Sequence, residues 1–246
     1  EAWVRKGAEG IIIRQLKRPV KRTLTNNATR RHDFVEVLKQ ANVCSLNISL
    51  DTLQPEKFNL ITRRNQFDLV FDNIHLLIKN GFHVKVNVVV MKGLNDNEIN
   101  DFIAWTKDTD VEVRFIEFMP FDHNRWTSNK VFTWKEINDV IETKYKITRL
   151  QDDLHDTSKK YSVAGHKGTF AIISTMSAPF CAGCNRMRLT ADGKMKNCLF
   201  SQTETDLLTV FRNGGDIVPL IYESIHFKEK ELGGQFTADF EHVHAE

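Results

Sequence analysis

The chain has 246 residues, of which 41% are hydrophobic and 27% charged, and its formal net charge is +2. A charge this close to zero argues against binding driven by bulk electrostatics, so neither a nucleic acid nor a membrane is expected as a partner. Four cysteines are too few for a disulfide scaffold. Three of them fall in one short loop, which is typical of a metal site in a reducing compartment.

The first two-thirds of the chain alternates strand-like and helix-like segments. Runs rich in β-branched and apolar residues predict strands at residues 22–27, 43–50, 83–90 and 111–118. Helical spacing of apolar residues predicts helices at residues 32–41, 67–81 and 95–108. The second helix should end at Gly81, and the third should have Asn95 or Asp96 as its N-cap. Such alternation predicts a parallel sheet, open or barrel-like, with ligands at the carboxyl ends of its strands.

The alternation stops after about residue 120, and a domain boundary is expected near residues 120–130. The later segments read as a helix at 133–145, an irregular or hairpin segment at 151–168, a strand at 169–175 and helices at 205–215 and 217–231. Between them, the turn signal at Ala191–Asp192–Gly193 predicts a hairpin.

The cysteine loop contains a C-x-x-C pair, Cys181 and Cys184, and Cys198 follows fourteen residues later. A hairpin would carry Cys198 back beside the pair, giving three thiolates, with His166 and His226 as the nearest candidates for a fourth ligand. The loop therefore reads as a structural zinc site, as a chance cluster of thiols, or as an iron–sulfur site with three protein ligands and one open iron.

Two arginines, Arg186 and Arg188, lie between the second and third cysteines. Because they alternate along one predicted strand, both should point to one face. Guanidinium groups suit phosphate oxygens, so an open metal position beside them could seat a phosphorylated substrate. The alternative is a solvated strand face.

The stretch "FCAGCNRMRLTADGKMKNCLF" resembles the C-terminal cluster motif of the molybdenum cofactor biosynthesis protein A family, the radical SAM enzymes called GTP 3′,8-cyclase. In order along the chain, "SLNISLDTL", "VKVNVVVMKGLNDNEI", "RFIEFMPFDHNRW" and "FAIISTMSAPFC" are similar to that family as well. The resemblance covers about residues 22 to 230. It implies a partial (β/α) barrel of the radical SAM type in residues 1–125, with its first strands missing. Residues 126–246 would form a C-terminal α+β extension that carries a second iron–sulfur site and binds GTP.

The resemblance also implies a set of site residues. Cys181, Cys184 and Cys198 would hold the GTP-binding 4Fe–4S cluster. GTP contacts are implied for Thr25, Lys85, Arg114, Arg186, Met187 and Arg188, and S-adenosylmethionine contacts for Ser49 and Met119. Lys85 and Arg114 lie within strands, where a basic residue is costly unless it faces a ligand. Structural alternatives are a loop cap for Ser49, core packing for Met119 and a solvent-directed ammonium for Lys85.

By resemblance, the reaction converts GTP to 3′,8-cyclo-7,8-dihydro-GTP with S-adenosylmethionine radical chemistry, the first step of molybdenum cofactor (molybdopterin) biosynthesis. The complete family enzyme uses a second 4Fe–4S cluster, is usually a homodimer, and passes its product to cyclic pyranopterin monophosphate synthase. Family members work in the mitochondrial matrix of eukaryotes or the cytoplasm of bacteria, and "MPFDHNRW" is more similar to the eukaryotic branch.

The chain departs from the family in several ways. The radical-generating C-x-x-x-C-x-x-C motif is expected before Glu1, so these residues hold the substrate half of the site and should be inactive alone, as a fragment or as a genuine shortened product. "TNNA" (residues 25–28) has Asn26 and Ala28 where the family has Thr and Gly. Gly233–Gly234 reads as a loop. A sheet edge is expected near residues 20–25.

Two rival functions are a zinc-stabilised nucleotide- or RNA-binding module and an inactive shortened subunit.

Overall fold

The computed structural model describes residues 22–29, 33–121 and 124–235. Within these ranges the chain forms two compact units. The sheet unit contains the residues up to Asp152 together with Ser158–Thr175, and the cysteine unit contains Asp153–Thr157 and residues 176–235. No helix in the described part of the chain has the length and apolar character needed to cross a bilayer.

The sheet unit is built on a seven-stranded sheet with the order β1-β2-β3-β4-β7-β6-β5. Its strands are β1 (Arg22–Asn26), β2 (Val43–Ser49), β3 (His83–Val90), β4 (Glu112–Glu117), β5 (Ile147–Arg149), β6 (Lys159–Val163) and β7 (Thr169–Ile173). Neighbouring strands from β1 to β4 are parallel, β7 is parallel to β4, and β5 and β6 are antiparallel. The predicted parallel sheet is confirmed, whereas a barrel stays a prediction. In the described residues β1 is a terminal strand of the sheet, as expected.

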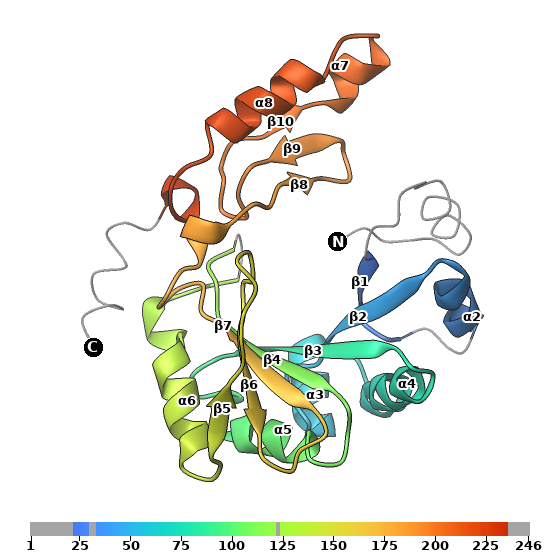
Figure 1. Ribbon diagram of the computed structural model, residues 1–246, viewed down its shortest axis with the longest axis vertical. Coiled ribbons are helices and arrows are strands. Elements are labelled where there is room, and N and C mark those ends of the chain that lie inside the picture. Colours follow the sequence, from blue (N-terminus) through green and yellow to red (C-terminus); the bar gives the residue numbers. More distant parts are fainter. Residues whose placement is uncertain (1–21, 30–32, 122–123, 236–246) are drawn as a thin grey trace. The chain divides into compact units, whose positions relative to one another are not determined.

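The helices α2 to α6 lie on one side of this sheet (Figure 1). They are α2 (Asp33–Gln40), α3 (Pro55–Thr62), α4 (Phe67–Lys79), α5 (Ile99–Trp105) and α6 (Trp134–Glu142), with short 3₁₀ turns η1 (Asp96–Glu98) and η2 (Ser128–Lys130). Buried side chains from all five helices join those of β2, β3, β4 and β7 in a single apolar core. The helix α6 begins with a capping box, in which Thr133 and Glu136 bond each other's backbone N–H groups.

The predicted N-cap of the third helix is wrong. Asn95 takes the N-cap position of the 3₁₀ turn η1 without a side-chain capping bond, and α5 begins only at Ile99, with Glu98 as its N-cap. The Asn95 amide instead donates to the carbonyls of Asp51 (2.6 Å) and Val89 (2.9 Å), and its oxygen accepts from the N–H of Met91 (2.8 Å). These hydrogen bonds satisfy part-buried backbone groups, and an unpaired buried polar group would be costly.

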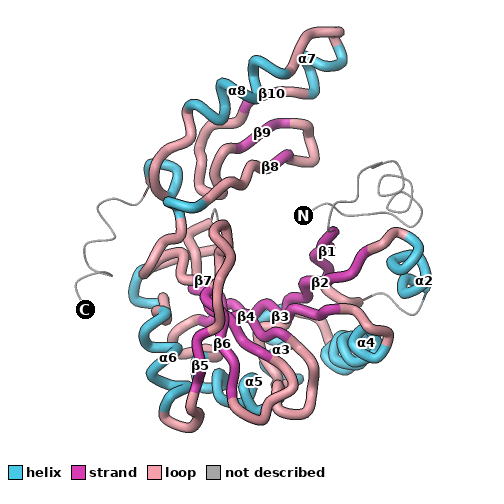
Figure 2. Tube along the Cα trace, in the orientation of Figure 1, coloured by secondary structure: helices cyan, strands magenta, loops and turns pink. Residues whose placement is uncertain are grey.

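The cysteine unit contains more loop than regular structure, as the colouring of Figure 2 shows. Its antiparallel sheet has the order β10-β9-β8, with β8 at Arg188–Leu189, β9 at Lys194–Lys196 and β10 at Thr205–Asp206. Two helices, α7 (Leu208–Arg212) and α8 (Val218–His226), and two 3₁₀ turns, η3 (Cys181–Gly183) and η4 (Leu232–Gly234), complete it. The pairing of β8 with β9 confirms the predicted hairpin.

Candidate functional site

In strands β1 to β4, one face of the sheet is apolar and the other carries a group of polar side chains. Along β3, the valines at 84, 86, 88 and 90 are buried, while Lys85 and Asn87 between them are part-exposed. Side chains alternate across a strand, so the valines face the helices and the polar residues face the opposite way. Parallel sheets are usually apolar on both faces, so a polar face in the interior strands indicates a surface that meets a ligand.

Register places two rows of side chains on this polar face. One row is Thr25, Asn47, Lys85 and Glu112, and the next is Ser49, Asn87 and Arg114. Four residues singled out from the sequence, Thr25, Ser49, Lys85 and Arg114, therefore share one face. The fifth, Met119, follows β4, and the carbonyl of Met119 accepts a hydrogen bond from the Asn124 amide (2.7 Å).

Lys85 has an acidic neighbour directly across the strand pair. Its Nζ lies 3.8 Å from Oε2 of Glu112, and Nε2 of His83 lies 3.4 Å from the same oxygen. Burial would raise the pKa of Glu112, but the bond to His83 and the charges of Lys85 and Arg114 outweigh it, and the pKa is lowered. Glu112 is therefore ionised. Its Oε1 is buried without a hydrogen-bond partner among the described residues.

Arg114 is held by a neutral partner. Its Nε donates to Oδ1 of Asn87 at 2.8 Å, and no hydrogen bond to another described residue engages its two terminal nitrogens. Burial lowers the pKa of Arg114, an effect that the Glu112 carboxylate partly offsets. Among the described residues no carboxylate contacts the guanidinium directly, so its terminal nitrogens could bind an anion.

The cysteine loop begins in η3, where Cys181 starts the turn and Cys184 follows it. Cys198 comes two residues after the hairpin strand β9, and all three thiols are free and part-exposed. Among the described residues, no three His, Cys, Asp or Glu side chains are already arranged as a metal site. His166 belongs to the sheet unit, where its Nδ1 bonds Oγ1 of Thr106 (2.9 Å), and His226 is exposed on α8.

The thiols differ in their electrostatic surroundings. The pKa of Cys181 is raised, mainly by burial, and the negative charges of Cys198, Glu231 and Cys184 raise it further. The hydrogen bond from the N–H of Leu232 lowers the pKa but does not cancel these effects. Burial also raises the pKa of Cys184, but positive and hydrogen-bonding groups outweigh this effect, and the pKa of Cys184 is lowered. These groups are the N–H and guanidinium of Arg186 and the ammonium of Lys228. Three soft thiol donors, of which Cys181 and Cys184 receive backbone N–H groups, fit an iron–sulfur cluster by their chemistry.

We expect alkylation of the metal-free protein to distinguish these two thiols. Because only the thiolate reacts, iodoacetamide near neutral pH should modify Cys184 faster than Cys181, and raising the pH should accelerate Cys181 more. Peptide mass spectrometry over a time course measures both rates. Equal rates at neutral pH, or a faster Cys181, would contradict the assigned pKa directions.

Two guanidinium groups accompany the thiols. Arg186 lies with its Cζ 5.0 Å from the ring centroid of Phe180, and Arg188 opens β8. Burial and the charge of Arg186 lower the pKa of Arg188, while Cys198 and Cys184 act in the opposite sense. Arg188 is therefore close enough to two of the thiols to interact with their charge. Met187 lies part-buried between the two arginines.

Sequence reasoning missed four residues that hold these groups in place. Asn87 and Glu112 could have been found from their position two residues from Lys85 and Arg114, which puts each pair on one face of a strand. No local signal points to Lys228 or Leu232, whose bonds to Cys184 and Cys181 span 44 and 51 residues.

Two family models match the chain and together define its class. Residues 4–106 match the radical SAM superfamily, and residues 111–233, half of the chain, match Molybdenum Cofactor Synthesis C. The chain thus combines a radical SAM part, which includes the parallel strands β1 to β3, with a molybdenum cofactor synthesis part that includes the cysteine loop.

Curated relatives agree with these matches. The chain is 39% identical to the GTP 3′,8-cyclase of Thermodesulfovibrio yellowstonii (94% of this chain, 74% of the relative). It is 44% identical to molybdenum cofactor biosynthesis protein 1 of Dictyostelium discoideum (96% and 39%) and 43% identical to the mitochondrial GTP 3′,8-cyclase of Arabidopsis thaliana (88% and 56%). The chain belongs to the radical SAM family of GTP 3′,8-cyclases and molybdenum cofactor biosynthesis proteins 1. It spans about 39% and 56% of the length of the last two relatives.

Proposed function

We propose that this chain is the GTP-binding part of a GTP 3′,8-cyclase, a lyase that converts GTP to 3′,8-cyclo-7,8-dihydro-GTP in molybdenum cofactor biosynthesis. The observation that carries the proposal is a loop of three free thiols with two arginines, in a chain similar over 74% of the length of a GTP 3′,8-cyclase. The names of the relatives do not favour a zinc-stabilised nucleotide- or RNA-binding module. The names of the relatives do not favour the second alternative, an inactive shortened subunit, either.

Cys181, Cys184 and Cys198 would hold a 4Fe–4S cluster. Such a cluster, when bound by three protein ligands, supplies one iron with an open position for a small molecule. Arg186 and Arg188, next to the thiols, would bind GTP through charge-assisted hydrogen bonds, with Met187 packing between them.

The polar face of the sheet would supply the remaining contacts. Lys85 and Arg114 are two cations of this face, and Arg114, whose terminal nitrogens bond no other described residue, suits the triphosphate. Thr25 would line the GTP site, while Ser49 and Met119 at the carboxyl ends of β2 and β4 would contact S-adenosylmethionine. These residues fix the substrate and exclude water, so their contribution is positioning.

The whole enzyme would use a second 4Fe–4S cluster with S-adenosylmethionine, act as a homodimer and hand its product to cyclic pyranopterin monophosphate synthase. Residues 1–125 would belong to the radical SAM barrel and residues 126–246 to the cluster- and GTP-binding domain. The proposed boundary at residue 125 differs from the boundary between the two compact units, because β5, β6 and β7 lie after residue 125 and still belong to the sheet. A relative named as mitochondrial supports a mitochondrial compartment, and the matrix stays part of the proposal.

Equilibrium dialysis of the anaerobically reconstituted chain against radiolabelled GTP tests the proposal. We expect saturable GTP binding that unlabelled GTP displaces and ATP displaces poorly, with binding lost when the cluster is stripped by a chelator. Colourless protein that holds stoichiometric zinc and binds no GTP would instead establish the zinc module.

A further inference from the structure

A short segment from the end of the described chain contacts the cysteine loop at three places. This segment, Lys228–Gly234, follows α8 and contains the η4 turn. The N–H of Leu232 lies 3.4 Å from Sγ of Cys181, and Nζ of Lys228 lies 3.6 Å from Sγ of Cys184. Two of the three thiols therefore receive a hydrogen-bond donor from one segment.

Glycine brings the same segment close to the chain just after the third cysteine. A Cβ at Gly233 would lie 3.0 Å from N of Ser201 and 3.1 Å from C of Phe200, and the φ of Gly233 is +66°. Only glycine accommodates both that approach and that backbone conformation. Leu232, beside it, also has a positive φ (45°) and is buried, so the surrounding packing holds the turn in an otherwise unfavourable conformation.

Lys228 is fixed in place by a second bond. Its ammonium also donates to the carbonyl of Arg186, at 2.8 Å. This second hydrogen bond to the cysteine loop holds the ammonium next to Cys184. Lys230, two residues further on, is exposed and makes no hydrogen bond or ion pair with another described residue. The two lysines thus carry the same charge in nearly the same place along the chain, and only one reaches a thiol.

We infer that the segment Lys228–Gly234 is a structural partner of the cluster site and that Lys228 raises the reduction potential of the cluster held there. The inference rests on the proposed cluster at the three cysteines. Reduction adds negative charge to a cluster and its sulfur ligands, and a cation or an N–H aimed at those sulfurs stabilises the reduced form. Removing the Lys228 ammonium should therefore make the cluster harder to reduce.

A redox titration with dithionite, followed by the EPR signal of the reduced cluster, tests this on the reconstituted chain. Lys228→Met removes the charge but keeps most of the side-chain volume, Lys228→Arg keeps the charge, and Lys230→Met is the matched control. We expect the midpoint potential to shift to more negative values in Lys228→Met, while Lys228→Arg and Lys230→Met stay near the unmodified protein. Selective loss of iron in Lys228→Met, with full loading in Lys230→Met, would also support the contact.

The failures of the two proposals can be told apart. An unchanged midpoint in Lys228→Met, or an equal shift in Lys230→Met, would overturn the role of Lys228 and leave the proposed cluster intact. If the unmodified chain takes up no iron at all, the proposed function and this inference are both wrong.

Discussion

Replacing Cys184 by alanine should reduce the iron bound after anaerobic reconstitution from about four atoms per chain to nearly none. Two remaining thiolates cannot hold a cluster that already relies on only three protein ligands. The same result is expected for Cys181→Ala and Cys198→Ala, because the three thiols act as one set. Iron and acid-labile sulfide analysis, together with the brown absorbance of the cluster, measures the loss.

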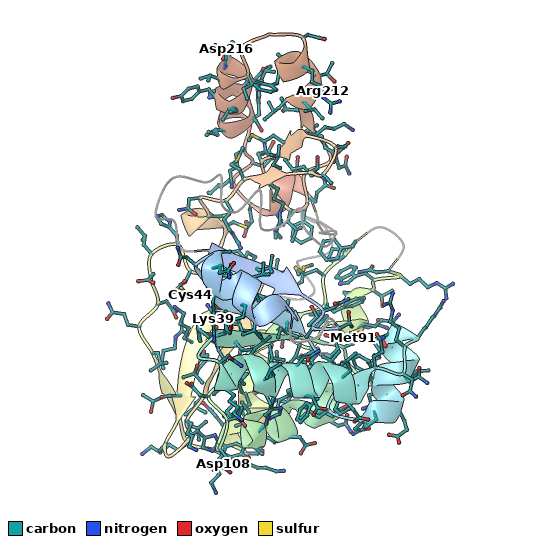
Figure 3. The ribbon with its side chains drawn as sticks, turned by 90° about the vertical axis from the view of Figure 1, so that its right-hand side faces the viewer. Lys39, Cys44, Met91, Asp108, Arg212 and Asp216 are labelled. Atoms are coloured by element: carbon teal, nitrogen blue, oxygen red, sulfur yellow. The ribbon has the colours of Figure 1, made fainter. Side chains whose placement is uncertain are left out.

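The chain provides its own control in its fourth cysteine. Cys44 is an exposed free thiol in β2 of the sheet unit, and Figure 3 labels it together with Lys39 of α2. Cys44→Ala should bind as much iron as the unmodified protein. Full iron content in a Cys184→Ala variant, or loss of iron in Cys44→Ala, would show that the cluster is not held by the predicted set.

Replacing Glu98 by alanine should strongly reduce the stability of the fold. Glu98 lies at the end of η1, and its side chain is buried, with 1% exposed. Its carboxylate accepts from the hydroxyl of Thr52 (2.8 Å), the N–H of Leu53 (2.8 Å) and the ammonium of Lys57 (2.6 Å). Glu98→Ala would leave both neutral donors without this acceptor, and the largely buried ammonium would keep only a neutral partner, Oδ1 of Asn97 at 3.4 Å. We expect the free energy of unfolding to fall by about 3–5 kcal/mol, measured by urea denaturation.

Two further variants separate the buried pair from its neighbours. Lys57→Met combined with Glu98→Gln should recover part of the loss, because no buried charge then lacks its partner. Glu36→Ala removes an exposed carboxylate 3.7 Å from Lys39 and should cost less than about 1 kcal/mol. A Glu98→Ala protein as stable as Glu36→Ala would refute the assigned role of this network, which ties the loop after β2 to η1.

Strand positions were predictable because the signal is local. The valines at 84, 86 and 88 alternate with polar residues, and this local pattern identifies β3 and its buried face. The cross-strand partners of Lys85 and Arg114 depend on register, which is set only when the neighbouring strands pack on the helices. The sequence therefore places Lys85 and Arg114 within strands, but it does not give their cross-strand partners.

Contacts between distant segments were beyond sequence reasoning. Asn95 has the residue type and position of an N-cap, yet its amide satisfies the carbonyls of Asp51 and Val89. Gly233–Gly234 was read as a loop, and nothing local indicates that the turn beginning at Leu232 donates to Cys181. In both cases tertiary hydrogen bonds override the local preference, since a buried polar group must find a partner wherever the fold provides one.

The central claim is that the cluster held by Cys181, Cys184 and Cys198 keeps an open iron at which GTP binds. The most direct measurement is the EPR spectrum of the dithionite-reduced cluster with and without GTP. We predict that saturating GTP changes the g-values of the spectrum while ATP leaves them unchanged, and that Arg186→Ala/Arg188→Ala weakens the response. A spectrum that GTP does not alter, in protein with a full complement of iron, would contradict the account.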